Sequence, residues 1–279
     1  MAVHDDLGIR MKDYEHRNQY FLQRRTPVAI RVDGKAFHSF TKGFQRPFDE
    51  IFVKSMQQTA KFMCENIQGA VLSFQQSDEI TLILIDYKKL NSDAWFGYRT
   101  DKMCSIAASM ATMAFNRYFN KEVNDWYYTC PIDTTKDTLW SKYMQSIEKG
   151  AMFDARVFNI PKEEVTNLIY WRQLDATRNS IQMVGQANFS HNELQNKSCN
   201  QIQEMLFQEK DINWNDYPTH LKRGSCCVKN HDYDEYGNDW GEGWRIDTEI
   251  PIFKEEGRQY INKRILYEEK EYIKCLNIN

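Results

Sequence analysis

The sequence predicts an α+β fold in which residues 1–161 contain the ferredoxin-like order β-α-β-β-α-β and are followed by helical and β-hairpin additions. Two features lead to this prediction. Short runs of β-branched and aromatic residues, typical of strands, alternate with two long segments in which apolar residues recur at the helical spacing. Acidic residues also follow the first strand and occupy the turn after the second, so we expect carboxylates to meet at one end of the sheet.

Local signals justify the elements of the first part in order. A polar helix is expected over 11–22, and Thr26-Pro27 stops it before a strand at 28–32. Apolar residues at i, i+3 and i+4 predict a helix over 48–67, which Gly69 closes. A tight turn between two apolar runs predicts a hairpin. The remaining expected elements are the hairpin strands 70–74 and 80–85, a second long helix within 91–119, an irregular aromatic connection at 120–152 and a strand at 153–160.

The character of the chain changes after Pro161. We expect two further helices and two further strands there, separated by a polar, acidic loop. In order, these are helices at 162–178 and 192–208, strands at 225–229 and 245–253 with the loop 230–243 between them, and a charged end at 255–279 that forms a helix or a loosely ordered tail. Residues 162–279 are therefore predicted to be an extension packed on the catalytic part, residues 1–161.

Composition excludes several classes of protein. The 279 residues are 42% apolar and 14% aromatic, which indicates an ordered globular protein with a full core. Mean hydropathy is −0.69, and no apolar stretch approaches the roughly 20 residues of a membrane helix. Seven scattered cysteines form no C-x-x-C pair, which favours reduced thiols in a cytoplasmic protein over a disulfide framework. The net charge of −3 means that any nucleic-acid surface must be local.

Two acidic positions, Asp33 and Asp78, are the strongest candidates for catalysis. Each lies at the end of a predicted strand, and two carboxylates side by side can hold two Mg²⁺ ions about 3.5–4 Å apart for nucleotidyl transfer. The Gly34 carbonyl is a further candidate metal ligand. Glu79 is expected to face the other side by strand alternation and to support the site. Alternatively, Asp33-Gly34 is an ordinary turn and Ser77-Asp78-Glu79 is a polar hairpin tip.

The loop behind the first aspartate is a candidate phosphate site. Gly34 permits an open backbone from which successive N–H groups point at a triphosphate, and Lys35 and His38 add side-chain donors. The Phe37 ring is expected to anchor the loop in the core. Ala36, between Lys35 and Phe37, belongs to the same candidate loop.

Basic residues elsewhere have two interpretations each. Arg99 and Lys102 share a helix face, which suits either phosphate contact or a solvated helix end. Arg46, with Pro47 to Asp49 behind it, is typical of a helix start, where these residues cap the helix and set its entry geometry. If RNA binds, plausible phosphate contacts are Arg172, Arg178, Lys222 and Arg223.

Taken together, these motifs resemble the tRNA-histidine guanylyltransferase superfamily, the enzymes that add nucleotides in the 3′–5′ direction. No single motif is decisive, but their joint order and spacing match through most of residues 7–190. The matching segments are 11–15, 31–40, 44–49, 77–79, 99–102, 153–156 and 171–180.

The resemblance implies a polymerase palm with two Mg²⁺ ions on Asp33 and Asp78. It implies that the segment from Asp33 to His38, helped by Ser77, cradles a nucleoside triphosphate, ATP or GTP among them. It also implies a homotetramer that activates a tRNA 5′ end with ATP. Further nucleotide-binding positions implied by the matching segments are Arg31, Arg46, Asp49, Arg99 and Lys102, although lysine is usual in the family where Arg46 stands.

One segment departs from the family pattern. Eukaryotic members carry Cys-His-Ile-Asn-Asn after Trp-Arg-Gln-x-Asp, whereas this chain has Ala176 to Ser180, including Arg178 and Asn179, the latter a further candidate RNA contact. This segment resembles the guanylyltransferase-like branch, which is associated with templated repair of 5′-truncated tRNAs. The expected function is therefore Mg²⁺-dependent 3′–5′ tRNA repair. The alternatives are addition of one guanylate to histidine tRNA, a palm-type nucleotide cyclase, and a non-catalytic RNA-binding module.

Overall fold

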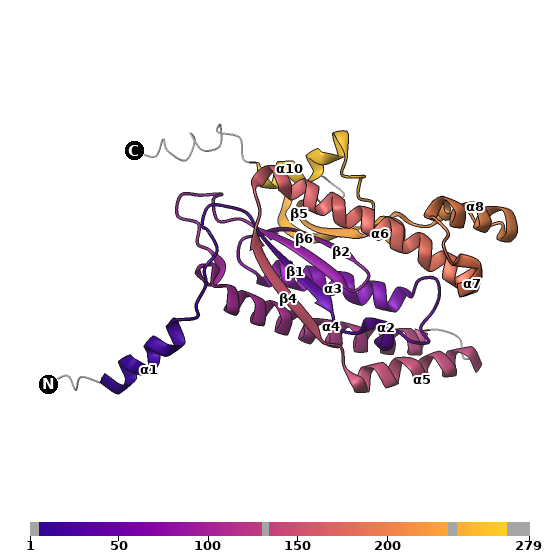
Figure 1. The fold of residues 1–279 in the computed structure, drawn as a ribbon, viewed down its shortest axis with the longest axis horizontal. Helices are drawn as coiled ribbons and strands as arrows, with labels where there is room; N and C mark the ends of the chain where they lie inside the picture. The colour runs from indigo at the N-terminus through magenta and orange to yellow at the C-terminus, as the bar shows by residue number, and fades with distance from the viewer. Residues whose placement is uncertain (1–5, 130–133, 234–238, 267–279) are drawn as a thin grey trace.

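A six-stranded antiparallel sheet forms the centre of the protein in the computed structural model, which describes residues 6–129, 134–233 and 239–266 (Figure 1). The strand order is β4-β1-β3-β2-β5-β6. The strands are β1 (Val28–Gly34), β2 (Ala70–Gln76), β3 (Glu79–Leu84), β4 (Phe153–Asn159), β5 (Ser225–Tyr233) and β6 (Asp239–Asp247). The predicted α+β class and the β-α-β-β-α-β order are confirmed, and β5 and β6 extend the sheet as the predicted hairpin.

Helices cover both faces of this sheet. Helices α3 (Glu50–Asn66) and α4 (Thr100–Thr129) pack on the face where β1 presents Val28, Ile30 and Val32. Helices α6 (Val165–Asn188) and α10 (Gln259–Ile265) pack on the opposite face, which receives Ala29. Because side chains alternate along a strand, Arg31 and Asp33 lie on the α6 face.

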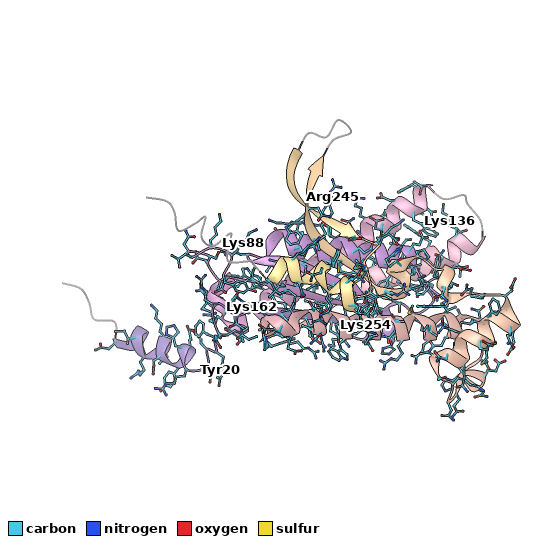
Figure 2. All side chains as sticks on the ribbon, turned by 90° about the horizontal axis from the view of Figure 1, so that it is seen from above. Tyr20, Lys88, Lys136, Lys162, Arg245 and Lys254 are labelled. Carbon is cyan, nitrogen blue, oxygen red and sulfur yellow. The ribbon has the colours of Figure 1, made fainter. Side chains whose placement is uncertain are left out.

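The other helices are short or peripheral. They are α1 (Asp6–His16), α2 (Phe37–Phe40), α5 (Thr134–Lys149), α7 (His191–Leu194), α8 (Cys199–Lys210) and α9 (Thr219–Arg223), with 3₁₀ turns η1 (Trp95–Tyr98), η2 (Lys162–Glu164), η3 (Trp214–Asp216) and η4 (Glu255–Arg258). Helix α1 has no buried residue and extends away from the sheet, with Tyr20 near its junction to the body (Figure 2). No helix of the described residues is long and apolar enough to cross a membrane.

Several predicted boundaries are wrong. The connection 120–152 is largely helical, because α4 continues to Thr129 and α5 buries Tyr143 against its aromatic neighbours. The N-terminal helix lies earlier than 11–22, since Phe21 instead forms a β-bridge with Arg99. The last strand is Asp239–Asp247 rather than 245–253, and Phe253 instead fills the core on the α6 face. The end after residue 266 lies outside the described residues.

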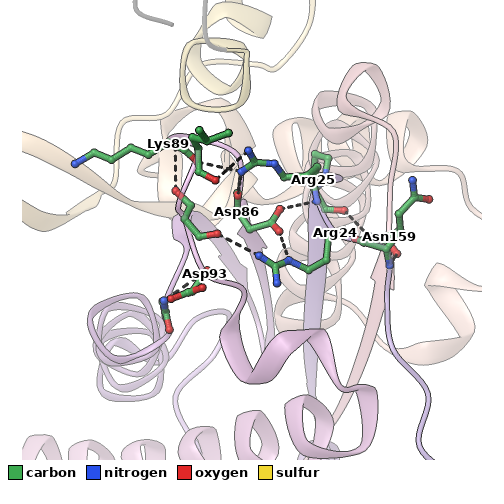
Figure 3. Close-up of polar contacts among 11 residues, drawn as sticks. Arg24, Arg25, Asp86, Lys89, Asp93 and Asn159 are labelled. Atoms are coloured by element: carbon green, nitrogen blue, oxygen red, sulfur yellow. Dashed lines mark hydrogen bonds and ion pairs between the residues drawn. The ribbon is translucent and has the colours of Figure 1, made fainter. Parts of the chain in front are cut away.

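An ion pair and several hydrogen bonds connect the segments at the end of the sheet where β1 starts (Figure 3). The buried carboxylate of Asp86 accepts from Arg24 Nε at 2.5 Å and from the Arg25 backbone N–H at 2.8 Å. The Arg25 guanidinium also donates to the Asp86 and Lys89 carbonyls. This arginine pair anchors the chain before β1. The candidate catalytic residues Asp33 and Asp78 lie at the other end of the sheet.

Candidate active site

The fold brings Asp33 and Asp78 to the same end of the sheet. Asp33 lies near the end of β1, and Asp78 lies in the turn between β2 and β3, where Ser77 adopts φ 51°. The Gly34 N–H donates to the Asp78 carbonyl at 3.1 Å, which ties the two segments together. Burial, together with the repulsion of the nearby Asp33 carboxylate, raises the pKa of Asp78 to about 6. Two carboxylates that repel each other in this way form an attractive position for a cation.

Strand register adds a carboxylate that the sequence interpretation missed. Asp33 lies directly opposite Glu79 on β3 and directly opposite Asp154 on β4. Residues opposite each other in antiparallel strands project to the same face, so three acidic side chains form a row across the sheet. The signal was available, since residues 153–156 belong to the family-like segments, but only the register shows that Asp154 faces the site.

Glu79 lies on the same face as Asp33, and the expectation that it faces the other side is wrong. Its carboxylate accepts from Arg172 Nη1 at 2.9 Å and lies 3.9 Å from Arg31 Nε. Burial raises the pKa of Glu79, and the two arginines oppose that rise. Arg172 is itself buried and lies 3.5 Å from Asp175. These contacts give both Glu79 and Arg172 a positioning role, and they direct Arg172 into the fold rather than toward an RNA phosphate.

The loop after β1 exposes Lys35 and His38 and buries Phe37, as the sequence predicts. The backbone N–H groups of Ala36, Phe37 and His38 make no hydrogen bond within the described part of the chain, so they are free to bind an anion. The left-handed residue is Ala36, at φ 56°. Gly34 is required for a different reason, because a Cβ at this position would lie 2.3 Å from the Phe37 ring.

Asp49 fulfils the capping alternative. It is buried at the start of α3, where its carboxylate accepts from the Phe52 N–H at 2.9 Å and from the Tyr143 hydroxyl at 2.6 Å. The Gln45 N–H donates to the same carboxylate at 3.0 Å. Asp49 therefore fixes the entry of the helix rather than facing a nucleotide, whereas Arg46 remains exposed.

Arg99 and Lys102 do not approach Asp33 within one chain. The Thr112 hydroxyl of α4 accepts from the Phe153 N–H at 3.2 Å, which places Thr112 beside the end of β1. Lys102 precedes it by ten residues, about 15 Å along the helix. Arg99 instead pairs with Asp101 at 3.0 Å, and the Lys102 ammonium lies over the Phe96 ring.

The remaining candidate RNA contacts differ in exposure. Arg178 is 60% exposed and pairs with Asp175, which also accepts from Asn179 at 3.4 Å. Lys222 is buried, and its ammonium donates to the Asn215 carbonyl and faces the Trp214 ring. Arg223 lies half-buried over the same ring. Of these residues, Arg178 is the one best placed to meet a ligand.

A chain of buried amides and hydroxyls supports the turn that carries Asp78. Gln75 Nε2 donates to the Ser77 carbonyl at 2.9 Å. Ser225 Oγ donates to Gln75 Oε1 at 3.2 Å, and Gln57 Nε2 donates to Ser225 Oγ at 3.3 Å. Strand β5 and helix α3 therefore hold the turn in place, which sequence spacing alone did not reveal.

Substituting Gln75 with methionine is expected to destabilise the protein by about 1–3 kcal/mol, because a near-isosteric apolar chain leaves buried polar partners unpaired. Urea unfolding measures the effect. Gln76→Met is the control, since this half-buried residue lies on the opposite face of β2. Equal stability of the two variants would contradict a supporting role for Gln75.

The donor set at this end of the sheet fits magnesium. The candidate ligands are the Asp33 and Asp78 carboxylates and the Gly34 carbonyl, all hard oxygen donors of the kind that Mg²⁺ binds together with water and phosphate. No group of three or more His, Cys, Asp or Glu residues within the described ranges has the geometry of a preformed metal centre.

Comparison with known proteins shows what this chain is similar to. A family model described as tRNAHis guanylyltransferase matches residues 8–161. A bacterial tRNA(His) guanylyltransferase-like protein in complex with ATP has a TM-score of 0.79 and 36% identity, covering 94% of this chain and 100% of that chain. A bacterial tRNA(His) guanylyltransferase-like protein in complex with GTP has a TM-score of 0.72 and 35% identity, and it likewise covers 94% of this chain and 100% of that chain. The tRNA(His) guanylyltransferase of Saccharomyces cerevisiae is 27% identical over 220 residues, 72% of this chain and 82% of that protein.

Proposed function

Because this chain belongs to the tRNAHis guanylyltransferase family of nucleotidyltransferases, we propose that it is a Mg²⁺-dependent 3′–5′ nucleotidyltransferase that repairs truncated tRNA 5′ ends. In the first step, the 5′-monophosphate of the RNA attacks the α-phosphorus of ATP, and pyrophosphate leaves. In the second, the 3′-hydroxyl of an incoming nucleotide attacks the activated 5′-phosphate, and AMP leaves. Relatives in complex with ATP and GTP support both kinds of substrate.

The observation that carries the proposal is the meeting of Asp33 and Asp78 beside an exposed loop with free N–H groups. Bound Mg²⁺ would stabilise the charge that develops on the transferred phosphoryl group. Asp33 and Asp78 would hold the ion, while the backbone N–H groups of 36–38 and the Lys35 and His38 side chains orient the triphosphate. Arg172 donates to the Glu79 carboxylate at 2.9 Å and so holds Glu79 on the strand position opposite Asp33.

The segment that departs from the family pattern supports repair over addition of one fixed nucleotide. Ala176 is buried, and the Ser180 hydroxyl lies inside the fold, donating to the Lys222 carbonyl at 3.1 Å. The Thr177 hydroxyl donates to the Gln173 carbonyl at 2.9 Å. Within this segment, Arg178 and Asn179 are the residues left to face a substrate, which supports selection of the nucleotide by base pairing with the opposite strand.

A second candidate is addition of a single guanylate to histidine tRNA. The GTP complex of a relative and the named activity of the yeast relative favour it. The two candidates differ in the RNA they accept and in their dependence on a template.

Incubation of a 5′-truncated tRNA with ATP, Mg²⁺ and all four nucleoside triphosphates tests the proposed function. Extension by the missing number of nucleotides is expected on several tRNA species, with products resolved by length. An intact tRNA is the control and should gain no nucleotide. Extension confined to histidine tRNA by one guanylate would establish the second candidate instead.

The positions of Arg99 and Lys102 bear on assembly. Lys102 lies about 15 Å along α4 from the end of β1 and Arg99 lies nearly one turn further, so another copy of the chain would bring these residues to a nucleotide bound at Asp33. The homotetramer implied by the family resemblance is therefore part of the proposal, and sedimentation equilibrium measures it. Cytoplasmic localisation stays a prediction.

A further inference from the structure

We propose that Trp171 is a stacking platform for a nucleobase at the end of the RNA substrate. This inference rests on the proposed function, because the ligand it names is the tRNA end on which the carboxylates act. Trp171 is 53% exposed, although it lies one residue from the buried Arg172. Exposed tryptophans beside a candidate phosphoryl-transfer site are chemically suited to base stacking, since every base has a π face.

Contacts on α6 show which way Trp171 faces. Arg172 points at Glu79 of β3, and Gln173 bonds the backbone of Pro251 and Phe253, with Phe253 packed on Phe74 of β2. Successive helical residues are about 100° apart, so Trp171 and Gln173 lie on opposite sides of Arg172. Trp171 therefore lies on the flank of α6 away from Gln173, on the solvent-exposed side of the helix, and connects to the acidic row through Arg172 and Glu79.

The Trp171 ring is held in place before any ligand arrives. The Arg172 guanidinium lies 3.7 Å from its centroid, and Arg172 is fixed in turn by Glu79 and Asp175. A continuous chain of contacts thus runs from the indole through Arg172 to the carboxylate opposite Asp33. A ring already fixed in this way loses little conformational freedom when a base stacks on it.

Charge on the neighbouring strands fits the backbone of an RNA end. Arg31 on β1 lies directly opposite Arg156 on β4, on the same face as the acidic row. Like charges in this arrangement repel unless an anion lies between them, and their contacts with Glu79 and Asp154 offset the repulsion only in part. Arg178 lies near Trp171 on the same side of α6 and is 60% exposed. An indole flanked by arginines can hold a base and its phosphates together.

The proposed reaction needs such a platform. A truncated 5′ end leaves the last base pair of the acceptor stem without a stacked neighbour, so nothing in the RNA itself fixes its distance from the metal site. Stacking on Trp171 would hold that terminal base while the incoming nucleotide pairs with the template strand. The platform would therefore position the RNA rather than select the nucleotide.

Direct binding measurements test the platform without turnover. A fluorescent hairpin RNA with a recessed 5′-monophosphate end is titrated with the full-length protein, and ATP binding is measured separately by calorimetry. Trp171→Ala is expected to weaken RNA binding about 5- to 150-fold, the loss typical of one base–aromatic stack, while ATP binding stays within about twofold. Trp171→Phe should remain within about threefold of the wild type. Leu174→Ala is the matched control, because Leu174 is 50% exposed one turn further along the same side of α6 but has no π face on which a base can stack.

Intrinsic fluorescence supplies a second readout that does not depend on the alanine variant folding. RNA binding should quench wild-type tryptophan emission, and Trp171→Phe should bind RNA while losing most of that quench. Unchanged RNA affinity in Trp171→Ala, an equal loss in Leu174→Ala, a loss confined to ATP, or an equal quench in Trp171→Phe would each overturn the proposal. Quenching without nucleotide addition by the wild type would contradict the proposed function alone.

Discussion

Replacing Asp33 or Asp78 with asparagine is expected to lower nucleotide addition by about 1,000-fold or more while leaving the fold intact. Each substitution removes one anionic metal ligand from a pair, and residues that act as a unit lose most of their effect when either one is removed. The assay is single-turnover addition to a 5′-truncated tRNA at saturating ATP and Mg²⁺.

The expected stability of the variants distinguishes a loss of metal binding from a loss of folding. The Asp78 carboxylate is disfavoured by burial and by the adjacent Asp33, so a neutral amide of the same shape should not destabilise the folded state. Asp125→Asn is the control, since this carboxylate lies exposed on α4, where it pairs with Lys121. Turnover close to the wild type in either active-site variant would exclude the two-metal interpretation.

The sequence predicts the fold where local patterns decide structure. The apolar periodicity of 48–67 corresponds to α3, and the strand, turn and strand over 70–85 correspond to β2 and β3, because each signal reports burial of one face. The segment 120–152 was misassigned because its aromatic residues are typical of strands as well as helices, and only packing around Tyr143 makes them helical. Tertiary contacts override local propensity at such positions.

The candidate site is predictable in part for the same reason. The meeting of Asp33 with Asp78 follows from element order, since a hairpin tip and a neighbouring strand end share one edge. The place of Asp154 depends on the register between β1 and β4, two strands more than 100 residues apart, and no local signal fixes it. Likewise, helical spacing puts Arg99 and Lys102 on one face but does not show that they lie at the far end of the sheet.

Changing the template base is expected to change the nucleotide added. A tRNA that lacks its first 5′ nucleotide should receive the base that pairs with the nucleotide opposite the gap, for each of the four template bases in turn. The physical reason is that Ala176, Thr177 and Ser180 are engaged within the fold, so no side chain of this segment except Arg178 and Asn179 can contact an incoming base. Watson–Crick hydrogen bonds to the template then satisfy only the matching nucleotide, and a mismatched base leaves polar groups unpaired, at a cost of about 1–3 kcal/mol each.

Sequencing of the extended products, with each nucleoside triphosphate supplied alone and in mixture, measures this selectivity. A product that changes with each of the four template bases requires that discrimination reside in the RNA. This dependence should persist in Arg178→Ala even if the rate falls, because base pairing with the template does not involve the exposed Arg178 side chain. Guanylate added whatever the template, and only to histidine tRNA, would show that the protein itself reads the nucleotide. In that case the buried positions of Ala176 and Ser180 would have no bearing on selection, and the single-guanylate activity would be the function of this chain.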